Sequence, residues 1–434
     1  MTGPTRFPAA RPIATTAALL LLVLLFLVPF HLTTPAAFAA DEDIRVLSSE
    51  RDVHFPEDIV LSLEVEGESE IVEVRLYYKA SPSGIWTYDY RELSPSQHVE
   101  ASFNLDLSGI NYLPPGTGLE YYYFIRDSSG NTHETSHETF IYVDDRFQWQ
   151  STTVGPLTIF WHDLPESRVE NVARRVESSL RDIVELLQVD LDHVPLRGVI
   201  YNTMSEAQEA FPFQSRAITQ EQVFQGFAFP EKGVFVGAGL QADLITHEAA
   251  HLIMEEAVSS PGTRIPSWVN EGFASYMEPN ARGFDGGFYG EPSPDLMPLR
   301  GMESIPGRPE AIRYFYRKSE SVVGYLLETH GVPKFRLFLE HLDERKSVDQ
   351  ALNASYGFGI DDLDRRWSSA VVPSENGDEG GGSSPFYYLD IFLLVAVALV
   401  ATVIFAANYL LRRLRRAREE PEDGLTDEEW EGRP

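Results

Sequence analysis

The stretch LITHEAAHLIMEEA (residues 244–257) decides how the C-terminal half of the chain is interpreted. It is apolar and free of helix breakers, which predicts a buried helix. Residues four positions apart share a helix face, so His247 and His251 can direct two imidazoles at one metal ion. Glu248 lies about 100° further around the axis and can reach a water beside that ion. The pattern fits a core helix with two histidines equally well, because its leucines and isoleucines would be buried in either case.

A catalytic zinc site needs a third protein ligand, because such sites have three protein ligands and one open position. The chain has no cysteine, and no histidine follows at the HxxGxxH spacing. The segment PSWVNEGFASYME (266–278) offers Glu271, 20 positions after His251. Pro266 suits the first turn of a helix. A second helix packed across the first could therefore deliver this carboxylate to the two imidazoles.

Together, HEAAH (247–251) and WVNEGFASYME (268–278) resemble the motifs of gluzincin metallopeptidases. The NEGFA segment is similar to the corresponding helix of aminopeptidase-N-like enzymes. This resemblance implies one Zn²⁺ ion bound by His247, His251 and Glu271, with Glu248 as the general base. The wider span 151–372 looks like the peptidase-MA-like domain of exported bacterial proteins.

The resemblance also suggests which group stabilises the oxyanion. In aminopeptidase-N-like enzymes this is a tyrosine in a Y-x-K-G segment that opens a downstream helix. Here Tyr316-Arg317-Lys318-Ser319 stands in a similar place, with serine replacing glycine. Tyr316 is therefore the catalytic candidate and Tyr314 its nearest rival, although both also fit as core aromatics. No Gly-x-Met-Glu-Asn segment is present to hold a free amine, which favours endopeptidase action.

Several further residues have two interpretations each. Asp243, four positions before His247, could orient an imidazole or serve as an acid in the first turn of the helix. Ser275, four positions after Glu271, could support the site in the same way. The strand GFAF (226–229) precedes the zinc-site helix, and in gluzincins an edge strand at that place pairs with the substrate backbone.

Two folded units are expected before the C-terminal segments. Residues 41–148 alternate apolar and polar side chains between turn signals, which predicts an N-terminal β-sandwich. The run LEYYYFIRDSSGN (119–131) resembles late strands of immunoglobulin-like and fibronectin-type modules. Residues 151–373 begin with strands and continue with helices, which favours an α+β metallopeptidase-like domain. An amphipathic helix is predicted at 165–187 and a hairpin at 226–237.

The two ends of the chain predict its location. Residues 1–39 resemble a secretory signal peptide, with an apolar run before Ala37-Phe38-Ala39. The run is long for this role, so an uncleaved membrane anchor is the alternative interpretation. Residues 374–388 form a predicted flexible linker, and the apolar residues 389–411 are long enough, at roughly 34 Å, to cross a bilayer as a transmembrane helix. The arginine-rich start of the tail, 412–434, places that tail in the cytoplasm. The folded units are then extracytoplasmic on a single-pass cell-membrane protein.

The sequence thus predicts a membrane-anchored zinc peptidase that acts on a peptide or protein substrate. The alternative is a catalytically inactive cell-surface binding or sensor protein that uses the β-sandwich for recognition. The formal net charge of −31 argues against nucleic acid as a partner, because binding to a phosphate backbone requires basic patches.

Overall fold

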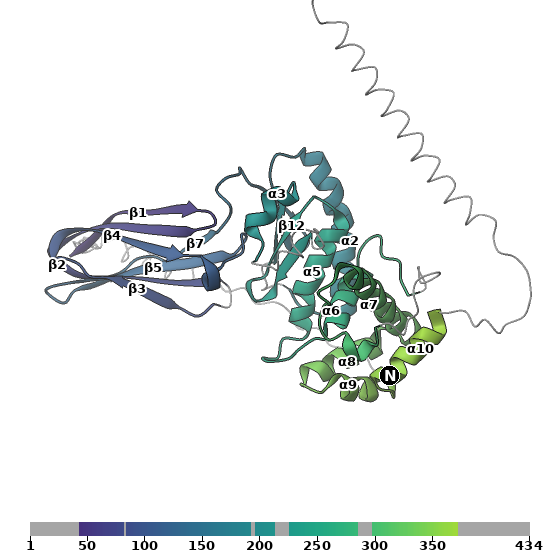
Figure 1. The fold of residues 1–434 in the computed structure, drawn as a ribbon. Coiled ribbons are helices and arrows are strands. Elements are labelled where there is room, and N and C mark those ends of the chain that lie inside the picture. Colours follow the sequence, from purple (N-terminus) through teal and green to yellow (C-terminus); the bar gives the residue numbers. More distant parts are fainter. Residues whose placement is uncertain (1–42, 82–83, 192–195, 213–224, 285–296, 372–434) are drawn as a thin grey trace, which may run out of the picture. The chain divides into compact units, whose positions relative to one another are not determined.

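The computed structural model describes residues 43–81, 84–191, 196–212, 225–284 and 297–371 (Figure 1). The predicted signal peptide, linker, transmembrane helix and cytoplasmic tail lie outside these residues. Within the described ranges, no helix is both long enough and apolar enough to cross a membrane.

The N-terminal part is a seven-stranded antiparallel sheet organised around one long strand, β2. The first half of β2 pairs with β1 and β4, whereas its second half pairs with β3 and β5 (Figure 1). Buried side chains from both halves join one hydrophobic cluster, so the sheet folds over its own core. The strands are β1 (Ile44–His54), β2 (Asp58–Ser81), β3 (Thr87–Arg91), β4 (Ser96–Asp106), β5 (Gly118–Asp127), β6 (Thr132–Glu134) and β7 (Glu138–Ile141).

The alternation in the sequence places the core side chains of this sheet correctly. Ile59, Leu61, Leu63 and Val65 are all buried. Residues 59–65 and 70–79 belong to one continuous strand, β2. The pairing register shifts between these halves, and a Cβ on Gly67 would lie 2.7 Å from the Ser69 carbonyl oxygen. Glycine therefore permits the tight local path by which β2 passes from the half that pairs with β1 and β4 to the half that pairs with β3 and β5.

The second sheet has the strand order β11-β12-β10-β9-β8. Its three central strands are parallel, and both edge strands are antiparallel to their neighbours. Helix α2 (Glu166–Leu187) is the crossover between β9 and β10, as parallel neighbours require. The predicted hairpin is present as β11 and β12. The strands are β8 (Gln150–Val154), β9 (Leu157–Trp161), β10 (Leu196–Tyr201), β11 (Gly226–Phe229) and β12 (Val234–Ala238).

Helices follow the second sheet, beginning with α5 (Ala242–Ala257), which carries the two histidines. Ile245, Ala249 and Ile253 of α5 are fully buried in the C-terminal core. The stretch that opened the sequence analysis is therefore a core helix as well as the carrier of the site residues. The remaining helices are α3 (Met204–Ala207), α6 (Ser267–Tyr276), α7 (Pro309–His330), α8 (Val332–Asp343), α9 (Val348–Tyr356) and α10 (Ile360–Val371), and the short 3-10 turns are η1 (Gly109–Asn111), η2 (Gln208–Ala210), η3 (Pro230–Lys232) and η5 (Leu299–Gly301).

Gly272 sets the distance between α6 and α7. A Cβ at this position would lie 2.3 Å from the Ser319 carbonyl oxygen and 2.8 Å from a methyl group of Val323. Because the obstacle is mainly backbone, the helices would have to move apart. This approach brings Tyr316, one turn before Ser319, close to the residues of α6.

We expect Gly272→Ala to destabilise the protein by roughly 1–3 kcal/mol, the usual range for overpacking a tight contact. Gly301→Ala is the matched control, because a Cβ there meets nothing within 4 Å. Chemical denaturation of both variants measures the difference. Equal free energies of unfolding for the two variants would contradict this expectation and show that α6 and α7 can move apart without loss of stability.

Candidate metal centre

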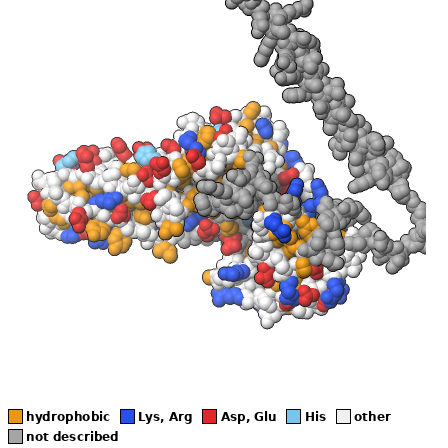
Figure 2. All heavy atoms as spheres, viewed as in Figure 1, with side chains coloured by type: hydrophobic (Ala, Val, Ile, Leu, Met, Phe, Trp, Pro, Cys, Tyr) orange, Lys and Arg blue, Asp and Glu red, His pale blue; other side chains and the backbone are white. Residues whose placement is uncertain are grey.

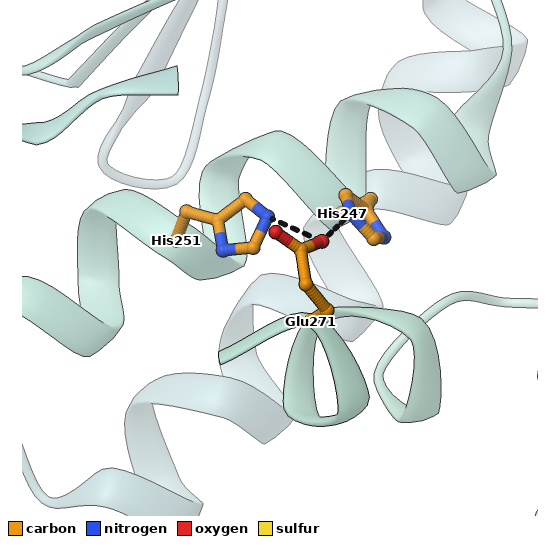
Figure 3. Close-up of side chains that lie close together, drawn as sticks. All are labelled: His247, His251 and Glu271. Carbon is orange, nitrogen blue, oxygen red and sulfur yellow. Dashed lines mark ion pairs between the residues drawn. The ribbon is translucent and has the colours of Figure 1, made fainter. Parts of the chain in front are cut away.

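Helices α5 and α6 bring three potential metal ligands together (Figure 3). Oε2 of Glu271 lies 3.4 Å from Nε2 of His247 and 3.5 Å from Nε2 of His251. One ligand atom from each residue lies within 4.8 Å of the others. All three side chains are largely buried. The structure therefore brings together the three residues that the sequence singled out as metal ligands.

The spacing of these atoms fits a tetrahedral metal ion. Bonds of about 2.0–2.2 Å at tetrahedral angles place neighbouring ligand atoms about 3.3–3.6 Å apart, and the two measured separations fall within this range. Glu271 Oε2 is also buried without a hydrogen-bond partner among the described residues. A cation between the imidazoles and the carboxylate would satisfy this oxygen.

Two residues that the sequence analysis missed orient the imidazoles. Nδ1 of His247 lies 2.9 Å from Glu278 Oε1, and Nδ1 of His251 lies 3.0 Å from Asn270 Oδ1. In each ring Nδ1 can donate to this oxygen, which leaves Nε2 unprotonated and available to a metal. Asn270 directly precedes Glu271, and Glu278 follows Glu271 by seven positions. This closeness in sequence to the third ligand was the signal that could have identified them.

Asp243 and Ser275, the residues that the sequence suggested for this supporting role, form none of these hydrogen bonds to the imidazoles among the described residues. Asp243 accepts hydrogen bonds of 3.1 and 2.8 Å from Nδ2 of Asn280 and lies in the first turn of α5. The interpretation as an acid at the helix start is therefore the one that its contacts support. Ser275 is buried and lines the cleft beside the site.

Glu248 lies against the edge strand β11. Its side chain is buried and faces the cleft. A Cβ on Gly226 would lie 2.5 Å from Glu248 Oε1. Glycine at the first position of β11 therefore makes room for this carboxylate between the strand and α5.

Tyr316 lies beside His247. Its ring centroid lies 6.1 Å from that of His247, and both Tyr316 and Tyr314 line the cleft. Two positions later, Lys318 is fully buried and its Nζ donates to Met297 O at 2.8 Å and to Asp364 Oδ1 at 2.7 Å. These bonds anchor the part of α7 that carries Tyr316.

The buried carboxylates strongly affect the titration of the metal-free histidines. Burial opposes protonation of His247, but the carboxylates of Glu271 and Glu278 outweigh it and raise its pKa to about 10. Burial likewise opposes protonation of His251, and Glu271 raises its pKa overall. Burial opposes ionisation of Glu271, yet the two histidines hold its pKa well below the usual range. Burial raises the pKa of Glu248 despite the same histidines.

Metal binding should therefore release protons. At pH 7, below a pKa of about 10, His247 is protonated in the metal-free protein, whereas a metal ligand must be neutral. Glu271 is already ionised and releases none. We expect one to two protons released per ion from the two histidines, and an affinity that rises with pH up to about pH 10, the pKa of His247. Calorimetric titration in buffers of different ionisation enthalpy counts the protons, and buffer-independent heats would contradict the expectation.

A cleft of about 1290 Å³ surrounds the site. Its walls include β11, the face of α5 that carries the two histidines, and the first turns of α7. Such a volume exceeds that of a typical small-molecule pocket and can hold an extended segment of several residues.

Residues 183–373 match the model of the Peptidase MA superfamily. The match covers less than half of the chain, includes every site residue discussed above, and supports a peptidase-like domain of this type in that span. No curated protein matches the chain.

Solved structures that match include wild-type OgpA from Akkermansia muciniphila, with 12% identity over 29% of this chain and 31% of that chain, at a TM-score of 0.21. BC0361, a polysaccharide deacetylase from Bacillus cereus, has 11% identity over 39% of this chain and 54% of that chain, at a TM-score of 0.19. The chain spans about a third of the length of the OgpA structures it matches. TM-scores this low do not support a conclusion about the fold or the function of this chain.

Proposed function

We propose that this protein is a zinc-dependent peptidase of the gluzincin type. The observation that carries the proposal is the convergence of His247 and His251 from α5 with Glu271 from α6, at 3.4 and 3.5 Å. The match of residues 183–373 to the Peptidase MA superfamily supports peptide bonds as the class of bond cleaved. Zinc suits this ligand set because two imidazoles and one carboxylate leave one position open for water.

A zinc ion held by His247, His251 and Glu271 would supply Lewis acidity, which can polarise a carbonyl group and activate water. Glu248, beside the ligands and open to the cleft, is positioned to take the proton from the attacking water and return it to the leaving amine. Tyr316, with its ring beside His247, is the candidate to donate its hydroxyl proton in a hydrogen bond to the developing oxyanion.

The edge strand β11 is the proposed place for the substrate backbone. Among the described strands, β11 pairs only with β12, so its other edge faces the cleft. An extended peptide can add to such an edge through main-chain hydrogen bonds. This binding mode needs no free terminus, which agrees with the endopeptidase action favoured by the sequence.

Cleavage of a mixed peptide library by the full-length protein tests this function. We expect cleavage that is lost with a chelator and restored by zinc, with products cut inside the peptides. A folded protein that binds zinc with its two histidines but cleaves no peptide would favour the binding or sensor role instead.

We also propose that residues 389–411 tether the enzyme to a membrane, with the described domains outside. The support is the apolar length of that segment and the arginines that follow it. Protease added to intact cells should remove the folded domains and leave the tail protected. Domains that survive such treatment, while a known surface protein is degraded, would contradict this topology.

A further inference from the structure

Two arginines at the start of α7 line the cleft. Arg308 and Arg313 are exposed, and neither forms a hydrogen bond, an ion pair or a ring contact with any described side chain. The chain as a whole carries a formal charge of −31, so arginines that form no ion pair with a described carboxylate are unusual in this protein. In Figure 2, Lys and Arg side chains stand out on the helical part of the visible face.

Apart from Glu248 and Glu271 at the metal centre, the acids that line the cleft are held by other groups. Glu278 contacts Nδ1 of His247, and Asp243 accepts from Asn280. Glu320 accepts from the backbone N–H groups of Arg282 and Gly283, at 2.5 and 3.1 Å. These carboxylates are therefore held by the protein itself, whereas the guanidinium groups of Arg308 and Arg313 have donors to offer a ligand.

The position of the arginines relates them to the reacting bond. Arg313 lies three residues before Tyr316, which places it one turn away on the same face of α7. The ring of Tyr316 lies beside that of His247. A peptide that reaches the metal centre along this wall therefore passes the turn that carries Arg313.

We propose that Arg308 and Arg313 form a specificity wall that selects peptides with an acidic side chain near the scissile bond. The inference rests on the proposed function only for the nature of the ligand as a peptide. A guanidinium group can bind a carboxylate through two parallel N–H donors, which suits it to this selection. Across an otherwise acidic protein, the wall also supplies the local attraction that an acidic peptide requires.

The test measures binding, which does not depend on turnover. Full-length protein carrying Glu248→Gln is titrated with fluorescent peptides of one length, amidated at the C-terminus, that differ in a single Glu, Gln or Lys. We expect the Glu peptide to bind at least about tenfold more tightly than the Lys peptide, with a smaller difference at high salt. Adding Arg308→Glu and Arg313→Glu should invert the order.

Arg181→Glu in the same background is the matched control, because Arg181 is an exposed arginine on α2 that does not line the cleft. It should leave the order unchanged. Equal binding of the Glu and Lys peptides would overturn the proposal. A preference that is absent from these amidated peptides, but present in matched peptides with a free C-terminal carboxylate, would also overturn it, in favour of recognition of the chain end.

Failure of this proposal and failure of the proposed function give different results. An acidic preference without cleavage by the wild-type protein would uphold the specificity wall and reject the peptidase. Cleavage without an acidic preference would do the reverse.

Discussion

Glu248→Gln should reduce peptide hydrolysis by about 10²–10⁴-fold, the contribution of a positioned general base. Glutamine keeps nearly the same shape but cannot take a proton from water. The zinc content and the stability of the variant should stay close to those of the wild type, because Glu248 is not one of the three ligands. Assays of kcat with a cleaved library peptide, next to metal analysis of the same sample, measure both properties.

Glu255→Gln is the control for this substitution. Glu255 lies on the same helix, is exposed and does not line the cleft. It should retain wild-type activity. Full activity of Glu248→Gln would remove this residue from the proposed mechanism, even if zinc remains essential.

Glu271→Gln should weaken zinc binding by more than about 100-fold, because loss of a residue that only supports a ligand already costs 10- to 100-fold. A neutral amide replaces the charged oxygen that faces both Nε2 atoms. Activity should fall in parallel and recover partly at high zinc concentration. Competition with a chromogenic chelator measures the affinity.

Glu278→Ala provides the comparison for Glu271→Gln. Glu278 contacts only the far nitrogen of His247, so its loss should reduce zinc affinity by about 10- to 100-fold. A larger effect from Glu278 than from Glu271 would mean that the assignment of ligand and supporting residue is wrong.

The sequence predicted the parts of this site that depend on local spacing. His247 and His251 share a helix face in any α-helix, and the proline before the NEGFA segment correctly indicated a second helix. The angle between α5 and α6 could not be predicted, because it depends on contacts such as that of Gly272 with Ser319. Asn270 and Glu278 were missed for a similar reason: the role of Asn270 depends on the rotation of α6 about its axis, and that of Glu278 on the path of the chain just after α6 ends.

The fold shows a similar division. Alternating side chains predicted the buried positions of the first sheet, because a strand has a period of two. The continuity of β2 was not predicted, because alternation alone does not show whether two runs of alternating residues join in one strand. The directions of the strands in the second sheet could not be predicted either, because the alternation of apolar and polar side chains does not show which strands pair.

The central claim is that two imidazoles and the Glu271 carboxylate hold one zinc ion. X-ray absorption at the zinc K-edge of the full-length, zinc-loaded protein tests it directly. The account predicts one zinc per chain, with outer-shell scattering from two imidazoles and nitrogen or oxygen neighbours at about 2.0–2.2 Å, and a first shell that changes in Glu271→Gln. A spectrum without imidazole scattering, or one that Glu271→Gln leaves unchanged, would contradict it.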